Sequence, residues 1–135
     1  MSTGSQRLVW RRGLLFEGED SRCFPLAISG DPEIPGAKPS DLLPLALASC
    51  LAYDVVVVLG KKRQELRSLV AVVESEQDDL PPLRFVSITV GFEVAGIVEN
   101  AAADRALELA VKNCPVLASL APTVEVVTSI TVTAG

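Results

Sequence analysis

The sequence predicts an α+β domain in which strands surround one long apolar helix. Residues 42–59 are mostly apolar with a single charge, residues 86–94 alternate between apolar and polar, and residues 99–113 place alanine and leucine at helical spacing. The expected order is strands, the long helix, strands, a second helix and a last strand. A chain of 135 residues is the size of one domain, so we expect a single domain over residues 1–135.

The first strands are expected before residue 30. Residues 8–16 alternate, with Trp10 and Phe16 on one mostly apolar face, which predicts a strand whose aromatic side chains belong to the core. Residues 22–29 predict a second strand that completes a hairpin, with Cys23 as a packing residue in it. A loop rich in proline then leads to the long helix.

The long helix has recognisable ends. Ser40 is a suitable N-cap, Asp41 suits the positive end of the helix dipole, and Pro44 lies in the first turn, where a missing N–H costs little. Gly60 and the basic residues 61–63 mark the other end. Because this helix has no polar face, we expect it to be covered on every side.

A membrane helix is the alternative for this segment, because its apolar stretch reaches the length that a bilayer requires. However, Asp54 would cost about 3 kcal/mol near the bilayer centre, and the flanking strands can cover a helix. The sequence therefore favours a buried central helix and no membrane partner.

The second half of the chain predicts three strands and two helices. Cys114 precedes Pro115 at the start of a short helix, where proline suits the first helical position and the cysteine is near the N-cap. The expected segments are strands over residues 68–76, 86–94 and 124–132, an amphipathic helix over 99–113, and a short helix ending at residue 120.

Composition excludes several functions. The net charge of −5 without a large basic cluster argues against a nucleic-acid partner. The absence of histidine removes Ser-His and Cys-His catalysis and most zinc sites, so we expect no metal and no cofactor. The first residues lack a long apolar run, and three cysteines without an export signal fit a reducing, cytoplasmic compartment. So apolar a helix strains the burial capacity of a chain this small, which favours a homodimer.

Cys50 and Cys114 are the candidate nucleophiles. A peroxide-reducing thiol attacks the O–O bond, becomes a sulfenic acid and is resolved by a second thiol, and two cysteines at special positions suit this chemistry. Inert burial is the alternative, since free cysteine is among the most buried residue types. Asp54 lies one turn after Cys50, and its ionised carboxylate would oppose formation of a Cys50 thiolate.

Three stretches together, AKPSDLLPLALASCLAYDVV, KNCPVLASL and WRRGLLFEGE, resemble the OsmC/Ohr family of thiol-dependent hydroperoxide reductases, and most closely its short OsmC-like branch. The resemblance covers nearly the whole chain. It implies an intertwined homodimer in which antiparallel sheets wrap two long central helices, with active sites at the subunit interface. It also implies that Cys50 is the peroxidatic cysteine and Cys114 the resolving one.

The same resemblance implies a carboxylate and an arginine at the site. Asp41 occupies the position of a family glutamate nine residues before Cys50, and nine residues turn a helix by about 180°. A carboxylate serving Cys50 would then come from a partner chain or from a bent first turn. The arginine that stabilises the thiolate is one of Arg11, Arg12 and Arg22, of which we choose Arg12, because we expect it on the Trp10 face of its strand.

The expected function is a cytoplasmic peroxidase of the stress response that reduces organic hydroperoxides, or hydrogen peroxide, and is recycled by an external dithiol. The alternative is a non-catalytic protein of the same fold that binds an apolar ligand or a partner at the dimer interface. A depressed pKa of Cys50 would distinguish the first from the second.

Overall fold

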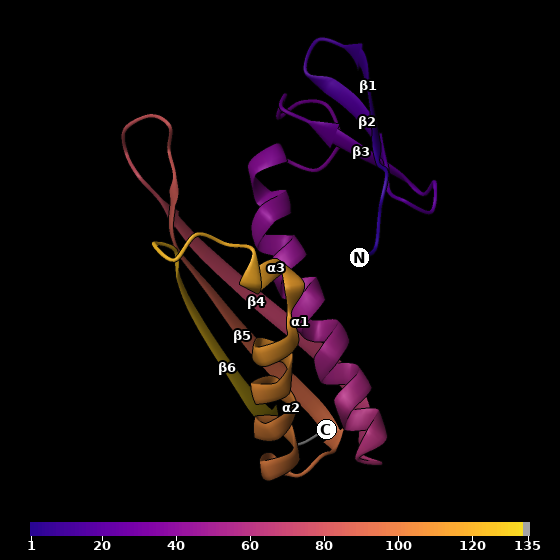
Figure 1. Ribbon diagram of the computed structural model, residues 1–135, viewed down its shortest axis with the longest axis vertical. Coiled ribbons are helices and arrows are strands. Elements are labelled where there is room, and N and C mark those ends of the chain that lie inside the picture. The colour runs from indigo at the N-terminus through magenta and orange to yellow at the C-terminus, as the bar shows by residue number, and fades with distance from the viewer. Residues whose placement is uncertain (134–135) are drawn as a thin grey trace. The chain divides into compact units, whose positions relative to one another are not determined.

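The chain forms two compact units, one from Met1 to Leu43 and one from Pro44 onward, in a computed structural model that describes residues 1–133 (Figure 1). The single domain expected over residues 1–135 stays a prediction, and each unit is described by itself. The elements of the chain before the long helix are β1 (Arg7–Arg12), β2 (Leu15–Glu19), β3 (Pro25–Ser29) and the 3-10 turn η1 (Pro39–Asp41). The elements that follow are α1 (Leu42–Lys61), β4 (Glu65–Gln77), β5 (Phe85–Ile97), α2 (Asn100–Asn113), α3 (Pro115–Ala118) and β6 (Glu125–Thr133).

The first unit is an antiparallel sheet with the order β1-β2-β3. The single strand predicted over residues 8–16 is wrong, because the chain turns at Gly13 and divides this segment between β1 and β2. Gly13 has a φ of 47°, a value that glycine adopts without steric cost, and its carbonyl accepts a hydrogen bond of 2.9 Å from Trp10 Nε1. The apolar alternation therefore continues through a turn.

Cys23 lies in the exposed turn between β2 and β3, so its prediction as a packing residue in a strand is wrong. The Asp20 side chain accepts hydrogen bonds from the backbone N–H groups of Phe24 at 2.9 Å and Arg22 at 2.8 Å. These bonds hold the pKa of Asp20 below its usual range, with the Phe24 bond as the larger cause. Because the turn occupies these residues, β3 begins only at Pro25.

One face of the first sheet is apolar and open. The register places Leu8 beside Gly18 and Gly18 beside Leu26, and it pairs Trp10 with Phe16. Trp10 is 65% exposed, so its assignment to the core is wrong for the single chain. The reason is that the elements of the first unit, as far as residue 41, are three strands and one 3-10 turn, none of which covers this face.

Helix α1 begins after a turn of 3-10 helix. Pro39 occupies the first position of η1 and Lys38 its N-cap, which places Ser40 inside the turn and not at the predicted N-cap. At the other end Arg63 takes the left-handed conformation with a φ of 57°, and its N–H donates to the Gly60 carbonyl at 3.0 Å. The chain reversal therefore comes three residues later than the glycine suggests.

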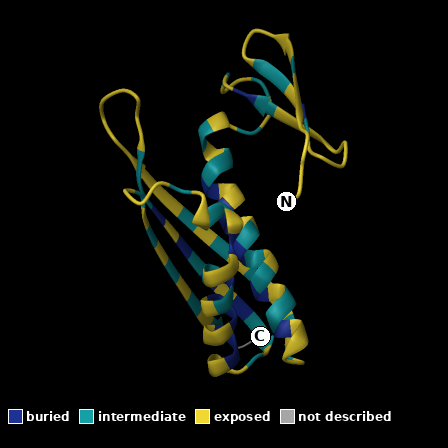
Figure 2. Cartoon of the chain, viewed as in Figure 1, coloured by how far each residue is buried: buried dark blue, intermediate teal, exposed yellow. Residues whose placement is uncertain are grey.

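Helix α1 is buried on one side only (Figure 2). Leu47, Leu51 and Val55 are fully buried, whereas Tyr53 is 69% exposed and Leu45 is 55% exposed. The expectation that every side is covered is therefore not met within one chain. By length and composition the segment could cross a membrane, but the core helix of a soluble protein passes the same test.

The second sheet has the order β4-β5-β6, and α1 and α2 lie over the same face of it (Figure 1). Strands β4 and β5 pair antiparallel, as expected, but β5 and β6 pair parallel. The cause is α2, which carries the chain back along the sheet before β6 begins. The core contains Ile88, Val90 and Phe92 of β5, which point toward the two helices.

The mixed α+β class is confirmed, as are the elements of the second half. The predicted amphipathic helix over 99–113 is α2, and the predicted short helix is α3 with Pro115 at its first turn. The three predicted strands correspond to β4, β5 and β6, each a few residues different at its ends.

Candidate functional site: a pair of thiols

The second unit brings Cys50 and Cys114 together, although they are far apart in the sequence. Cys50 lies on α1 between the buried residues Leu47 and Leu51, and Cys114 is the N-cap of α3 directly after α2 ends. Their side chains are close enough to form a hydrogen bond, and both thiols are free. Cys114 is buried in the core, and Cys50 is half-buried against it.

The first turn of α3 contacts both sulfurs. The Leu117 N–H donates to Cys114 Sγ at 3.4 Å, as expected for an N-cap side chain. The Val116 N–H donates to the Cys50 sulfur. The Val116 amide is not among the predicted site residues, and its only signal in the sequence is the Cys-Pro pair that starts this helix. The two hydrogen bonds and the core packing hold the sulfurs in one small volume.

The surroundings of Cys50 favour the neutral thiol. Burial is the largest cause that raises the pKa of Cys50, followed by the hydrogen bond with Cys114. The Val116 N–H lowers the pKa, but the charges of Cys114 and Asp54 raise it further, which agrees with the effect expected of Asp54. A thiolate at this position therefore needs a positive charge that the immediate surroundings of Cys50 do not contribute.

The three candidate arginines belong to the first unit. Arg11 pairs with Glu17 at 3.2 Å, and Arg22 lies 3.9 Å from Asp20. Arg12 is exposed at the end of β1. A bulge after Trp10 pairs Arg12 with Leu15, so the register places Arg12 on the face opposite Trp10. The prediction that Arg12 lies on the Trp10 face is therefore wrong.

Asp41 is exposed in the 3-10 turn before α1, and its backbone N–H donates to the Lys38 carbonyl at 3.0 Å. Asp41 therefore ends a 3-10 turn, and both origins expected for a carboxylate that serves Cys50, a partner chain or a bent first turn, stay predictions. Asp41 and Arg12 lie in the first unit and the thiols in the second, so the roles of both residues stay predictions. Within residues 1–133, no group of three or more cysteine, aspartate or glutamate side chains could hold a metal ion.

Comparison with protein families identifies the fold. The family model described as OsmC-like protein matches residues 30–129 of the chain, which include both cysteines of the pair. The chain belongs to the OsmC-like family. Protein YhfA of Escherichia coli strain K12 is 32% identical over 131 residues, which cover 96% of this chain and 98% of YhfA.

Solved structures share the arrangement of elements. A hypothetical protein from Aquifex aeolicus VF5 superposes with a TM-score of 0.89 at 24% identity, covering 100% of this chain and 99% of that one. An organic hydroperoxide resistance protein OsmC from Legionella pneumophila gives a TM-score of 0.67 at 16% identity, covering 97% and 98%. The OsmC-like fold is confirmed, and α1 is its core helix.

Proposed function

We propose that this OsmC-like protein is a thiol peroxidase that reduces organic hydroperoxides. The observation that carries the proposal is the contact between Cys50 and Cys114, two free thiols delivered by separate helices to one place. The solved structure from Legionella is named an organic hydroperoxide resistance protein, which supports the same substrate class for this chain. Hydrogen peroxide is a smaller substrate of the same chemistry.

The reaction uses the thiols in sequence. The Cys50 thiolate attacks the terminal oxygen of the hydroperoxide, the O–O bond breaks, and the alkoxide leaves and takes up a proton as the alcohol. Cys50 is now a sulfenic acid. The Cys114 thiol attacks its sulfur, forms the Cys50–Cys114 disulfide and releases water. An external dithiol then reduces this disulfide and returns both cysteines to thiols.

Arg12 is our choice for the charge that activates Cys50. The pKa of Cys50 is raised by its own surroundings, so the thiolate requires a cation from elsewhere in the assembly. An arginine within about 6 Å favours the charged form of a nearby acid. Arg12 has the role of binding the thiolate and the leaving oxygen, and Asp41 has the role of orienting Arg12 as the family glutamate would.

A homodimer is part of this proposal. The exposed side of α1 is apolar, with Leu45, Tyr53 and Val56 uncovered in one chain, and the first sheet has an open apolar face. A second copy would bury both surfaces and bring a first unit to the thiol pair. We place the protein in the cytoplasm, where free thiols and dithiol reductants coexist.

The test is peroxide consumption by the reduced protein with cumene hydroperoxide and a dithiol. We expect the wild type to consume peroxide continuously. Cys114→Ser should react once, stop at the Cys50 sulfenic acid and form no Cys50–Cys114 disulfide. In Cys50→Ser the rate of peroxide consumption should fall by at least about a thousandfold. Cys23→Ser is the matched control and keeps full activity, because Cys23 lies in an exposed turn. Equal consumption by the wild type and Cys50→Ser would refute the proposal.

A second candidate function is favoured by the raised pKa of Cys50. In it, the protein is a non-catalytic OsmC-like member that binds an apolar ligand or a partner at the dimer interface, and the cysteines only pack. The first unit contains an apolar hollow of about 470 Å³ lined by Leu8, Gly18, Phe24 and Leu26, which suits such a ligand. Slow alkylation of Cys50 in the intact dimer, with no thiolate below about pH 7, would favour this function.

A further inference from the structure

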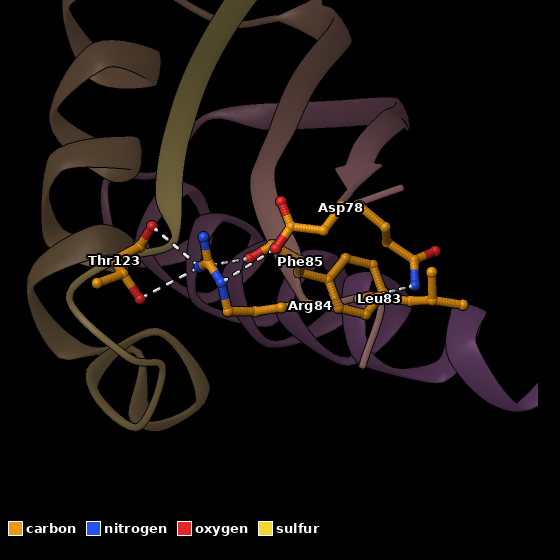
Figure 3. A network of polar contacts seen from close by, with 6 residues as sticks. Asp78, Leu83, Arg84, Phe85 and Thr123 are labelled. Atoms are coloured by element: carbon orange, nitrogen blue, oxygen red, sulfur yellow. Dashed lines mark hydrogen bonds and ion pairs between the residues drawn. The ribbon is translucent and has the colours of Figure 1, made fainter. Parts of the chain in front are cut away.

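Arg84 ties two loops of the second unit together. It precedes β5, and its Nη1 donates to Thr123 Oγ1 at 3.2 Å and to the Thr123 carbonyl at 3.5 Å, as Figure 3 shows. The same nitrogen lies 3.1 Å from the Phe85 carbonyl. Thr123 belongs to the loop that leads from α3 into β6, so one guanidinium joins chain segments that are distant in sequence.

The position of the guanidinium is itself held from the other side. Arg84 Nε lies 3.6 Å from Asp78 Oδ2, and the Asp78 N–H donates to the Arg84 carbonyl at 2.8 Å (Figure 3). Gln77 Nε2 also donates to the Leu83 carbonyl at 2.9 Å across the base of the same hairpin loop. Arginine presents several donors in a rigid plane, so it can bind Asp78 and Thr123 at once.

The segment from Cys114 to Val124, which we name the cysteine connector, begins with the buried thiol and ends just after Thr123. Its internal hydrogen bonds follow one another: Ala118 N–H to Cys114 O, Ser119 Oγ to Pro115 O, Leu120 N–H to Leu117 O, and Val124 N–H to Ala121 O. A connector held at both ends by α2 and by Arg84 has fewer conformations than one held at a single end. The bonds at Thr123 therefore restrict the conformations of the cysteine connector.

We propose that Arg84 is a positioning residue for the thiol pair, which holds the cysteine connector so that Cys114 stays against Cys50. The inference rests on the proposed function only in one respect: Arg84 would then favour efficient resolution of the Cys50 sulfenic acid. The effect of Arg84 on the position of Cys114 does not depend on peroxide chemistry. Loss of the Arg84 bonds lowers the effective concentration of one thiol at the other.

The experiment measures the equilibrium between the reduced protein and glutathione disulfide. Two protein thiols and one glutathione disulfide give the Cys50–Cys114 disulfide and two molecules of reduced glutathione. Trapping and intact mass give the equilibrium constant for this disulfide. We expect Arg84→Gln to lower it about threefold to tenfold, because a half-exposed charge with several hydrogen bonds contributes modestly. Arg84→Lys keeps the charge without the planar donors, so its equilibrium constant should lie between those of the wild type and Arg84→Gln.

Arg105→Gln is the matched control. Arg105 is a similarly exposed arginine of the same unit that pairs with Glu108 on α2 at 3.0 Å, and its loss leaves the disulfide equilibrium unchanged. Thr123→Val removes the Oγ1 acceptor and keeps the carbonyl, so it should lower the equilibrium constant by a smaller factor than Arg84→Gln does. Thr123→Val serves as the test if Arg84→Gln fails to fold. Melting of the reduced proteins measures general stability separately.

The outcomes separate this inference from the peroxidase proposal. An unchanged or increased equilibrium constant in Arg84→Gln and Thr123→Val overturns the inference. A decrease in Arg105→Gln as large as that in Arg84→Gln overturns it too, as does a wild type that forms no Cys50–Cys114 disulfide. A wild type that forms the disulfide with glutathione disulfide but consumes no peroxide overturns the proposed function alone. A decrease confined to the Arg84 and Thr123 variants supports the inference in either case.

Discussion

The two sheets of this molecule have the same number of strands but different surroundings. In the second unit α1 and α2 pack on β4-β5-β6, and Phe92 at the centre of β5 is 1% exposed. In the first unit the β1-β2-β3 sheet keeps an apolar face open, with Trp10 on it. The second unit thus completes its own core, whereas the first unit has an apolar face that its own strands do not cover.

This difference suggests a division of roles between the units. The second unit contains both thiols of the candidate site and the packing that positions them. The first unit contains the candidate arginines and an uncovered surface of the kind that marks a contact with another chain. The proposed homodimer would join these parts, and each prediction tests one side of the comparison.

The largest expected effect is on the core of the second unit. Phe92→Ala removes a buried ring from β5 and should lower the free energy of unfolding by about 3–5 kcal/mol. Trp10→Ala, the matched change in the first sheet, should cost less than about 1 kcal/mol when the chain is monomeric. Urea unfolding followed by circular dichroism at low protein concentration measures both. Equal losses would show that the first sheet is covered within one chain.

The next effect is on assembly. Trp10→Ala should weaken the proposed homodimer by more than about tenfold in its dissociation constant, because large aromatic side chains dominate interfaces. Tyr53→Ala on the open side of α1 should do the same. Sedimentation velocity over a range of concentrations measures this. Arg105→Ala, an exposed change on α2, is the control, and a wild type that is monomeric at every concentration would contradict the prediction.

A third prediction concerns the charge that the first unit is proposed to supply. In Arg12→Gln the raised pKa of Cys50 is uncompensated, so alkylation of Cys50 by iodoacetamide at neutral pH should slow about tenfold and should accelerate as the pH rises into the alkaline range. Because this pKa is raised in the folded state, the reduced variant should also lose stability as the pH rises through that range. Arg11→Gln is the control, and a slower alkylation there with an unchanged rate in Arg12→Gln would assign the role to Arg11.

The smallest effect concerns the second unit alone. Asp54→Asn removes a negative charge that raises the pKa of Cys50, so the alkylation rate at neutral pH should increase, by about twofold to fivefold for a partly exposed charge. Asp104→Asn on the exposed side of α2 should leave the rate unchanged. A decrease in Asp54→Asn would show that this carboxylate assists the thiolate.

Local patterns predicted most of the second unit but less of the first. The alternation of residues 86–94 and the helical spacing of residues 99–113 correspond to β5 and α2 because these elements bury one face each. In the first unit the same kind of alternation concealed a turn, since Gly13 interrupts the strand without interrupting the apolar pattern. Cys23 was misplaced because the hydrogen bonds of Asp20 with the turn decide where β3 begins.

The sequence by itself determined the apolar helix and the short helix that starts at Cys114-Pro115, because each depends on residues close together in the chain. The order of such local patterns also determined the α+β class and the resemblance to the OsmC/Ohr family. The tertiary structure alone decided that β6 runs parallel to β5, that α1 keeps one apolar side open within one chain, and that the Val116 N–H donates to the Cys50 sulfur. These three features depend on how distant segments pack. The local pattern of apolar and polar residues is the same whichever segment covers an apolar face, so it does not specify the packing.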